Sequence, residues 1–309
     1  MNGKITVIGS GGVGSNLGFH LINRLSLKEL VMVDISGDLA RGTALDLEDT
    51  RGILGFSTEI TGTEDLSHLE NSDIVIITAG IARKEGMTRA DLLKINGKIA
   101  TDLAKSIKTY APSAITIVVT NPLDIITYIV TEEIQTQRGK VIGMGASLDT
   151  SRLLNILRNA SGISVSSLEA YVLGMHNKDM LVPLDRFKIK GHPLDKFIKK
   201  SEADKLRTRV QERGTEIVGF LKNKSACFAP SLACCKLIEA IIYDKNEVIP
   251  VSVKLNGEYG LTDVCAGVPC VINSKGAEKI IEIELTVAEK AEFNKVETAF
   301  AEFKTTRIK

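Results

Sequence analysis

A glycine-rich stretch near the N-terminus has the spacing of a loop that binds phosphate groups. It fits the pattern G-x-G-x-x-G and consists of Gly9, Ser10, Gly11, Gly12, Val13 and Gly14. The first glycine of such a loop allows a tight turn, the second lets the backbone approach a pyrophosphate, and the third lets a helix pack closely on a strand. The phosphates then bind at the N-terminus of the following helix, where free N–H groups attract negative charge.

An acidic residue follows the glycines at the distance that this type of site requires. Asp34 lies twenty residues after Gly14 and is the last residue but one of the run 29–35. A carboxylate there can accept hydrogen bonds from both hydroxyls of an adenosine ribose, and it would repel a 2′-phosphate. We therefore expect NAD as the cofactor in preference to NADP. On these residues alone, another user of the same loop, such as a methyltransferase, stays open.

The glycine loop lies between an expected strand and an expected helix, which is where its mechanism requires it. Residues 4–9 are apolar and rich in β-branched side chains, whereas 13–25 carry apolar residues at helical spacing. Further strands are expected at 29–35, 73–79 and 115–120, and further helices at 38–50, 90–109 and 123–136. Short apolar strands that alternate with helices predict a doubly wound parallel sheet of the Rossmann type.

The pattern changes after about residue 142, and this change predicts a second domain. Helices are expected at 148–160, 201–221, 231–243 and 286–305, and strands at 168–173, 248–255 and 268–272. The last two strands suit an antiparallel arrangement with a turn at Asn256-Gly257. We therefore expect an α/β chain in which a Rossmann domain, 1–142, is followed by an α+β catalytic domain with antiparallel strands, 143–309.

The composition argues against several other classes of protein. The 309 residues carry 39 Lys and Arg against 38 Asp and Glu, so nothing favours nucleic acid or an anionic membrane surface as a partner. No apolar run approaches the roughly 18 residues of a membrane span, and the N-terminus does not resemble an export signal. The five cysteines form no C-x-x-C pair. We expect no metal site, a cytoplasmic location and reduced, mostly buried thiols.

Three further segments carry motifs that are more specific than the glycine loop. They are 81–89 directly after Thr78-Ala79-Gly80, Asn121-Pro122, and 148–152 followed later by Gly174-Met175-His176. Together, and in this order, these motifs resemble the lactate/malate dehydrogenase family. More narrowly, they are similar to its lactate-dehydrogenase-like group of malate dehydrogenases. The resemblance covers essentially the whole chain.

The resemblance implies a role for each matching residue. It implies that His176 is the catalytic histidine, that Asp149 is the aspartate paired with it, and that Arg152 grips the substrate C1 carboxylate. It further implies that Arg89, on a mobile loop, polarises the reacting carbonyl. The positions that it implies for lining the cofactor are Asn96, Val119, Thr120 and Asn121, the last of which also lies beside the substrate.

Arg83 matches the position that selects the substrate. The resemblance implies arginine there for malate and glutamine for lactate, so it implies a small dicarboxylic acid, malate or oxaloacetate, as the substrate. The segment 81–91 is expected to close over that substrate and bring Arg83 and Arg89 into the site. The family also implies a homodimer or homotetramer and a step of the tricarboxylic acid cycle.

The chemistry of the implied reaction accounts for these residue types. Oxidation of a 2-hydroxy acid removes a proton from oxygen and transfers a hydride from carbon to the nicotinamide, so the protein needs only an acid–base group. Histidine titrates near neutral pH, and a carboxylate on its other nitrogen fixes the tautomer and stabilises the imidazolium. An arginine fork binds a carboxylate through two parallel hydrogen bonds, which also orients the substrate.

The segment after His176 departs from the family pattern. Gly-Asp usually follows the histidine, whereas here Asn177-Lys178-Asp179-Met180 follows and makes the segment one residue longer. Asparagine tolerates a positive φ better than most residues do, so Asn177 is expected to replace the glycine. The other histidines are expected to be structural; they are His20, His68 and His192.

Two alternatives to a malate enzyme stay open on these residues. A lactate or other 2-hydroxy acid dehydrogenase would share the motifs except for Arg83. A non-catalytic NAD-binding protein is supported only by the altered segment after His176. The presence of Asp149, Arg152 and Arg89 beside that histidine in the motif set argues against it, because a protein without catalysis has no use for all four residues.

Overall fold

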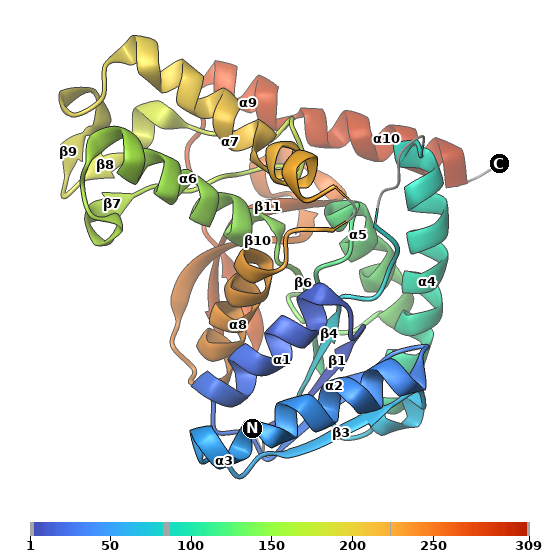
Figure 1. Ribbon diagram of the computed structural model, residues 1–309. Coiled ribbons are helices and arrows are strands. Elements are labelled where there is room, and N and C mark those ends of the chain that lie inside the picture. The colour runs from blue at the N-terminus through green and yellow to red at the C-terminus, as the bar shows by residue number, and fades with distance from the viewer. Residues whose placement is uncertain (1–2, 83–86, 223, 308–309) are drawn as a thin grey trace.

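A nine-stranded sheet forms the centre of the molecule in the computed structural model, which describes residues 3–82, 87–222 and 224–307 (Figure 1). Its strand order is β12-β11-β10-β6-β5-β4-β1-β2-β3. The strands are β1 (Lys4–Ile8), β2 (Glu29–Val33), β3 (Glu59–Thr63), β4 (Ile74–Ile77), β5 (Ile115–Val118), β6 (Val141–Gly143), β10 (Glu247–Asn256), β11 (Thr262–Asn273) and β12 (Gly276–Ile280). The strands β1 to β6 run parallel to one another, and the other three pair antiparallel.

The parallel half of the sheet forms because its central strands are buried on both faces. Every residue of β4 and β5 is buried, and the β-branched residues that fill these strands suit such positions. The helices of this half are α1 (Gly12–Arg24), α2 (Gly37–Asp49), α3 (Arg51–Leu54), α4 (Arg89–Tyr110) and α5 (Leu123–Ile134). The strand order reverses between β1 and β4, and doubly wound folds bind their ligands beyond the carboxyl ends of the strands at such a point.

The second half of the chain extends the same sheet and adds further helices. Ser252 of β10 pairs with Gly143 of β6, so the antiparallel strands continue the parallel ones. The remaining elements are α6 (Gly145–Ser161), α7 (Lys200–Leu221), α8 (Phe228–Ile242), α9 (Val287–Phe293), α10 (Lys295–Arg307) and a small sheet of β7 (Leu168–Glu169), β8 (Lys188–Ile189) and β9 (His192–Pro193). In Figure 1, α8 lies against α1, and one buried core joins the two halves. Within the described ranges, no helix has the length and hydrophobicity to cross a membrane.

The expected fold class is confirmed, and the local differences have physical reasons. The strand expected at 168–173 ends at Glu169. The end of the expected range pairs elsewhere, because Leu173 pairs with Leu181 and Gly174 pairs with β11. The helix expected at 286–305 is divided into α9 and α10 at Asn294. The sequence pattern does not predict β3, since this edge strand contains a glycine and none of its residues is fully buried.

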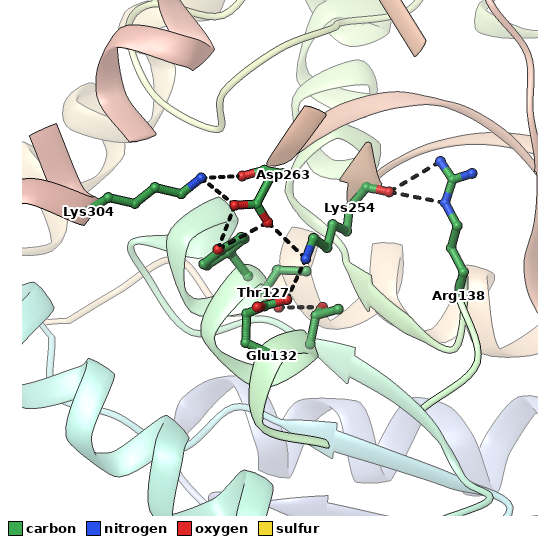
Figure 2. A network of polar contacts seen from close by, with 8 residues as sticks. Thr127, Glu132, Arg138, Lys254, Asp263 and Lys304 are labelled. Carbon is green, nitrogen blue, oxygen red and sulfur yellow. Dashed lines mark hydrogen bonds and ion pairs between the residues drawn. The ribbon is translucent and has the colours of Figure 1, made fainter. Parts of the chain in front are cut away.

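A network of charged side chains connects α5 and α10 to the antiparallel strands (Figure 2). Lys254 of β10 places its Nζ 2.5 Å from Oε1 of Glu132 on α5 and 2.9 Å from Oδ1 of Asp263 on β11. Lys304 of α10 lies 2.6 Å from the other oxygen of Asp263. Isolated surface pairs contribute little to stability, but several charges joined in one network constrain geometry better. The network therefore holds α5 against β10.

Candidate active site

The glycine loop connects β1 to α1, and two of its glycines have no room for a side chain. A Cβ on Gly14 would lie 1.8 Å from the carbonyl oxygen of Gly9, and a Cβ on Gly9 would lie 2.6 Å from Oγ1 of Thr78. Gly9 also has a φ of 109°, which residues with a side chain rarely adopt. The start of α1 therefore lies as close to the end of β1 as backbone atoms allow, as a pyrophosphate-binding loop requires.

The N-terminus of α1 offers polar groups to a bound anion. Gly11 occupies the N-cap position, and a Cβ there would meet nothing within 4 Å. Ser10 is buried, and its Oγ has no hydrogen-bond partner among the described residues. The carbonyl of Val13 accepts a hydrogen bond from Ser231 of α8 at 2.8 Å, so the second half of the chain supports the loop. A dinucleotide pyrophosphate fits this arrangement.

Asp34 follows directly after β2 and lies beside the glycine loop. Its Oδ2 accepts the backbone N–H of Ser10 at 2.8 Å, and its Oδ1 accepts that of Ser36 at 3.0 Å. A carboxylate has about four lone-pair sites, so these two hydrogen bonds orient the group without exhausting it. The position and remaining capacity of Asp34 fit an adenosine ribose.

The carboxyl ends of β4 and β5 bring the next group of expected residues together. Val119, Thr120 and Asn121 follow β5 directly, and Thr120 donates a hydrogen bond to a carbonyl just beyond β4 at 2.7 Å. The buried side chain of Asn96 on α4 accepts the N–H of Ile81 at 2.8 Å and donates to the carbonyl of Asn121 at 2.7 Å. Asn96 therefore ties the two strand ends to each other.

His176, Asp149 and Arg152 form one largely buried cluster. Nδ1 of His176 lies 2.5 Å from Oδ2 of Asp149, and Nη1 of Arg152 lies 3.0 Å from Oδ1 of the same carboxylate. The Asp149 side chain is 1% exposed, and the other two are each 13% exposed. Asp149 and Arg152 lie one turn apart on α6, so helical spacing puts them on one face. Among the described residues Nε of Arg152 has no partner, which leaves a donor for a ligand.

The surroundings of His176 raise the pKa of its imidazole. Burial on its own favours the neutral ring and lowers the pKa, but the charge of Asp149 and the hydrogen bond to it outweigh this effect. Arg152 opposes the increase, and Asp124 adds to it. The raised pKa favours the protonated ring, which suits a group that takes up a proton from a substrate and returns it.

Two glycines position His176. A Cβ on Gly145, the first residue of α6, would lie 2.6 Å from Cγ of the imidazole ring, so only glycine leaves room for that ring. Gly174, with a φ of 82°, exchanges two backbone hydrogen bonds with Gly267 of β11, at 2.9 and 2.8 Å. His176 therefore lies at the end of a segment that is anchored to the sheet.

The expectation that Asn177 adopts a positive φ is wrong. In this segment the positive φ occurs at Gly174, and Asn177 begins a tight turn instead. Its carbonyl accepts the N–H of Met180 at 3.2 Å, and its Oδ1 accepts that of Asp179 at 2.6 Å. The positive φ of this segment therefore precedes His176, and residues 177–180 after it form the turn. The imidazole of His176 keeps its contact with Asp149.

Two of the expected arginines fall at the edge of what the structure describes. Arg83 lies outside the described residues. Arg89 is the first residue of α4, and its side chain is not among the described atoms. The helix begins there because Thr88 and Asp91 form a capping box, in which each side chain accepts the other's backbone N–H.

Two residues that the sequence analysis does not single out contact the cluster. Asp124 of α5 accepts the backbone N–H of His176 at 2.7 Å, and Ser252 of β10 donates to the same carboxylate at 2.7 Å. An aspartate just after Asn121-Pro122 is a visible signal in the sequence. Its partners, however, lie 52 and 128 residues away along the chain, so no local pattern connects them.

The remaining histidines and the cysteines contribute none of these contacts. His20 lies on α1, where burial and then Arg24 lower its pKa, and His192 is exposed on β9. His68 lies between β3 and β4. The buried cysteines, whose pKa burial raises, are Cys234, Cys235, Cys265 and Cys270. Most thiols are therefore buried as expected, while Cys227 is partly exposed next to the glycine loop.

The site combines a glycine loop of the type that binds phosphates, a carboxylate placed as in ribose-binding sites, and a histidine–aspartate pair beside an arginine. These features are expected of a dinucleotide-dependent oxidoreductase. Comparison with family models agrees with this class. Residues 3–143 match the model for the lactate/malate dehydrogenase NAD binding domain, and residues 146–306 match that for the lactate/malate dehydrogenase alpha/beta C-terminal domain. The chain therefore belongs to the lactate/malate dehydrogenase family.

Relatives in this family include enzymes named malate dehydrogenase and enzymes named lactate dehydrogenase. A malate dehydrogenase from Desulforudis audaxviator is 41% identical over 293 residues, which cover 94% of each chain. The crystal structure of Cryptosporidium parvum malate dehydrogenase has a TM-score of 0.93 at 34% identity and covers 98% of each chain. That of lactate dehydrogenase from Eimeria maxima with NADH and oxamate has a TM-score of 0.95 at 31% identity and covers 100% of this chain and 95% of the other. The fold alone does not select the substrate.

Proposed function

We propose that the protein is an NAD-dependent malate dehydrogenase, which reversibly oxidises (S)-malate to oxaloacetate. The observation that carries this proposal is the buried carboxylate of Asp149, which contacts both His176 and Arg152. Asp149 thus brings a proton acceptor, His176, and a guanidinium that can bind a carboxylate, Arg152, into one site. Oxidation of a 2-hydroxy acid requires both groups. The NAD-binding family model and the relatives named malate dehydrogenase support the same activity.

Each residue of the cluster then has one task. His176 accepts the proton of the substrate hydroxyl during oxidation and returns it during reduction. Asp149 holds Nδ1, which leaves Nε2 for the substrate, and it stabilises the imidazolium. Arg152 binds the C1 carboxylate through the donors that Asp149 does not engage. NAD, when bound, supplies the acceptor for the hydride that leaves the substrate carbon.

We assign the cofactor to the glycine loop and the strand ends beside it. The residues are Gly9, Ser10, Gly11, Gly12, Val13, Gly14, Asp34, Asn96, Val119, Thr120 and Asn121. The close approach of Gly14 to Gly9 supports this assignment, as does the hydroxyl of Ser10, which has no hydrogen-bond partner within the described ranges.

We assign the second carboxylate of malate to Arg83 and the reacting carbonyl to Arg89. The segment that carries both arginines leaves β4 at the edge of the site. A Cβ on Gly80 would lie 2.6 Å from Cγ2 of Thr120, and Ile81 is hydrogen-bonded to Asn96. The start of the segment therefore lies among the residues assigned to the cofactor, which supports the expected closure of 81–91 over a substrate.

Steady-state assays with NADH test the substrate. The purified chain is expected to reduce oxaloacetate with a higher kcat/KM than pyruvate. Faster turnover of pyruvate would favour a lactate dehydrogenase. NADH binding without turnover of either 2-oxo acid would favour a non-catalytic NAD-binding protein.

Replacing Asp34 with serine is expected to shift the cofactor preference toward NADPH. The substitution removes a charge-assisted hydrogen bond to the ribose, which corresponds to about a 10- to 150-fold weaker affinity for NADH. It also removes the repulsion of the 2′-phosphate. Fluorescence titration with both cofactors measures the ratio of the two Kd values. Asp38→Ser, at a solvent-exposed position in the first turn of α2, is the control, and an Asp34→Ser ratio equal to that of the control contradicts the assignment.

The raised pKa of His176 predicts opposite pH dependences for the two directions. Reduction of oxaloacetate needs the protonated ring, so its kcat/KM should remain at a plateau past pH 6.5, the ordinary value, and fall as the pH passes the raised pKa. Oxidation of malate needs the neutral ring, so its kcat/KM should rise over the same interval. In Asp149→Asn both midpoints should move to lower pH. Midpoints that stay in place would mean that Asp149 does not raise the pKa of His176.

We further propose that residues 1–142 bind NAD, that 143–309 provide the substrate site, and that the protein works in the cytoplasm as a homodimer or homotetramer. Exposed apolar side chains on neighbouring helices support self-association, because Leu45 of α2 is 62% exposed and Ile53 of α3 is 86% exposed. Size-exclusion chromatography with light scattering measures the mass of the particle in solution. A monomer at assay concentrations contradicts the proposed self-association.

A further inference from the structure

Asp124 is a buried carboxyl group that the reaction described above does not use. It lies in the first turn of α5 and is 3% exposed. Its Oδ2 accepts the backbone N–H of His176 at 2.7 Å, and its Oδ1 accepts the hydroxyl of Ser252 at 2.7 Å. Ser252 is fully buried on β10. The two oxygens thus connect the backbone of the histidine to the sheet.

A buried carboxyl group needs a physical reason to be present. Burial raises the pKa of Asp124 because the charged form loses its hydration, while the hydrogen bonds from His176 and Ser252 act in the opposite direction. The N-terminus of α5 adds a favourable dipole at the same position. An apolar side chain would avoid the loss of hydration, but it would leave the N–H of His176 and the hydroxyl of Ser252 without this acceptor.

Asp124 also connects two parts of the site that must act together. It lies three residues after Asn121, which is assigned to the cofactor and the substrate and whose carbonyl accepts a hydrogen bond from Asn96. The segment 121–124 therefore runs from the cofactor side of the site to the backbone of His176. A proton and a hydride leave neighbouring atoms of one substrate, so their two acceptors must keep a constant separation.

We propose that Asp124, held in place by the hydrogen bond from Ser252, is a positioning residue. It fixes the backbone of His176 relative to the segment 121–124. This inference rests on the proposed dehydrogenase function. Asp124 does not touch the reacting atoms. It acts through the main chain of His176, while Asp149 orients the side chain of the same residue.

The contacts between α5 and β10 hold Asp124 and Ser252 in register. Two residues beyond Ser252, and therefore on the same face of β10, Lys254 pairs with Glu132 at 2.5 Å. Glu132 lies eight residues, or about two turns, after Asp124 on α5. Figure 2 shows this second contact between the two elements. Because α5 meets β10 at two points, Asp124 has little freedom to leave the backbone of His176.

Two substitutions of similar size separate hydrogen-bond acceptance from charge. Asp124→Asn keeps an oxygen that can accept the N–H of His176, and its amide can donate to Ser252, whose hydroxyl also accepts. It is expected to retain kcat within about tenfold of the wild type. Asp124→Leu keeps the shape and removes the acceptor, so kcat for oxaloacetate should fall about 100-fold, the size of effect expected for an error of about 1 Å in position. The Kd for NADH should stay unchanged in both variants.

Thr127→Val and Ser252→Ala complete the experiment. Thr127, labelled in Figure 2, is fully buried on the same helix, and its hydroxyl donates to the carbonyl of Leu123 there. Thr127→Val therefore controls for the loss of a buried polar group in α5 and should keep kcat. Ser252→Ala removes one donor to Asp124 and should lower kcat to a value between those of the wild type and Asp124→Leu. If Asp124→Leu does not bind NADH, Ser252→Ala decides the question in its place.

The outcomes distinguish this inference from the function on which it rests. A wild-type chain that does not turn over oxaloacetate contradicts the proposed function itself. An active wild type together with an unchanged kcat in Asp124→Leu overturns only the positioning role. An equal loss in Asp124→Asn and Asp124→Leu also overturns it, because the charge rather than the acceptor would then matter. Faster hydrogen exchange at the amide of His176 in Asp124→Leu, but not in Thr127→Val, supports it.

Discussion

Replacing His176 with asparagine is expected to lower kcat for malate oxidation and for oxaloacetate reduction by roughly 10²- to 10⁴-fold, the range that general acid–base catalysis contributes. An asparagine side chain can still reach toward Asp149 as a donor, but its amide neither gains nor loses a proton near neutral pH. The affinity for NADH should not change, because the residues assigned to the dinucleotide stay in place. Steady-state rates and a fluorescence titration measure the two effects separately.

His192→Asn is the matched control for this experiment. His192 is exposed on β9, in the small sheet, so its loss should leave both the rate and the NADH affinity at their wild-type values. A His176→Asn variant with a kcat within about tenfold of the wild type would show that another group carries the proton. A loss of NADH binding would instead point to misfolding of the anchored segment that carries His176.

Replacing Arg83 with glutamine is expected to reverse the substrate preference. Malate and oxaloacetate bring a second carboxylate into the closed site, and without Arg83 that charge would be buried unpaired at a cost of about 3–5 kcal/mol. This cost corresponds to a loss of about 150- to 5,000-fold in kcat/KM for oxaloacetate, since 1.36 kcal/mol is about a factor of ten. With pyruvate bound, the arginine itself is the unpaired charge, so its removal should raise kcat/KM for pyruvate.

The ratio of kcat/KM for oxaloacetate to that for pyruvate measures this reversal. Lys84→Gln removes a neighbouring positive charge from the same segment and serves as the control, since a general effect of charge would change both variants alike. An unchanged ratio in Arg83→Gln would contradict the assignment of the second carboxylate to this residue. A loss with both substrates would indicate a role in closing the segment rather than in selectivity.

Local patterns account for the parts of the fold that the sequence predicts. The glycine loop, its flanking strand and helix, and the alternation that follows depend on residues within a few positions of each other, because backbone periodicity and turn geometry are local. The approach of Gly14 to Gly9 requires five residues of chain. The sequence pattern does not predict β3 and β6, because their local signals are weak. The strand β3 is a half-exposed edge, and β6 has only three residues, Val141–Gly143.

The positive φ near the histidine shows where such patterns fail. A missing glycine after His176 suggests a positive φ at Asn177, but Asn177 does not have one, and the positive φ of this segment is at Gly174. The reason is tertiary, because Gly174 pairs with Gly267 of β11, a strand that lies some ninety residues further along the chain. A sequence motif records which residues are present, whereas the backbone angles also depend on the strand that packs beside them.

The sequence by itself determined the dinucleotide loop, the doubly wound order of elements and the one-turn spacing that puts Asp149 and Arg152 on one face of a helix. It also contains Arg83, on which the proposed substrate rests. Only the tertiary structure decided that the imidazole of His176 lies 2.5 Å from Asp149 and that Asp124 and Ser252 hold its backbone. Local spacing dictates which side chains share a face, whereas contacts between residues 27 to 128 positions apart exist only after the helices pack on the sheet.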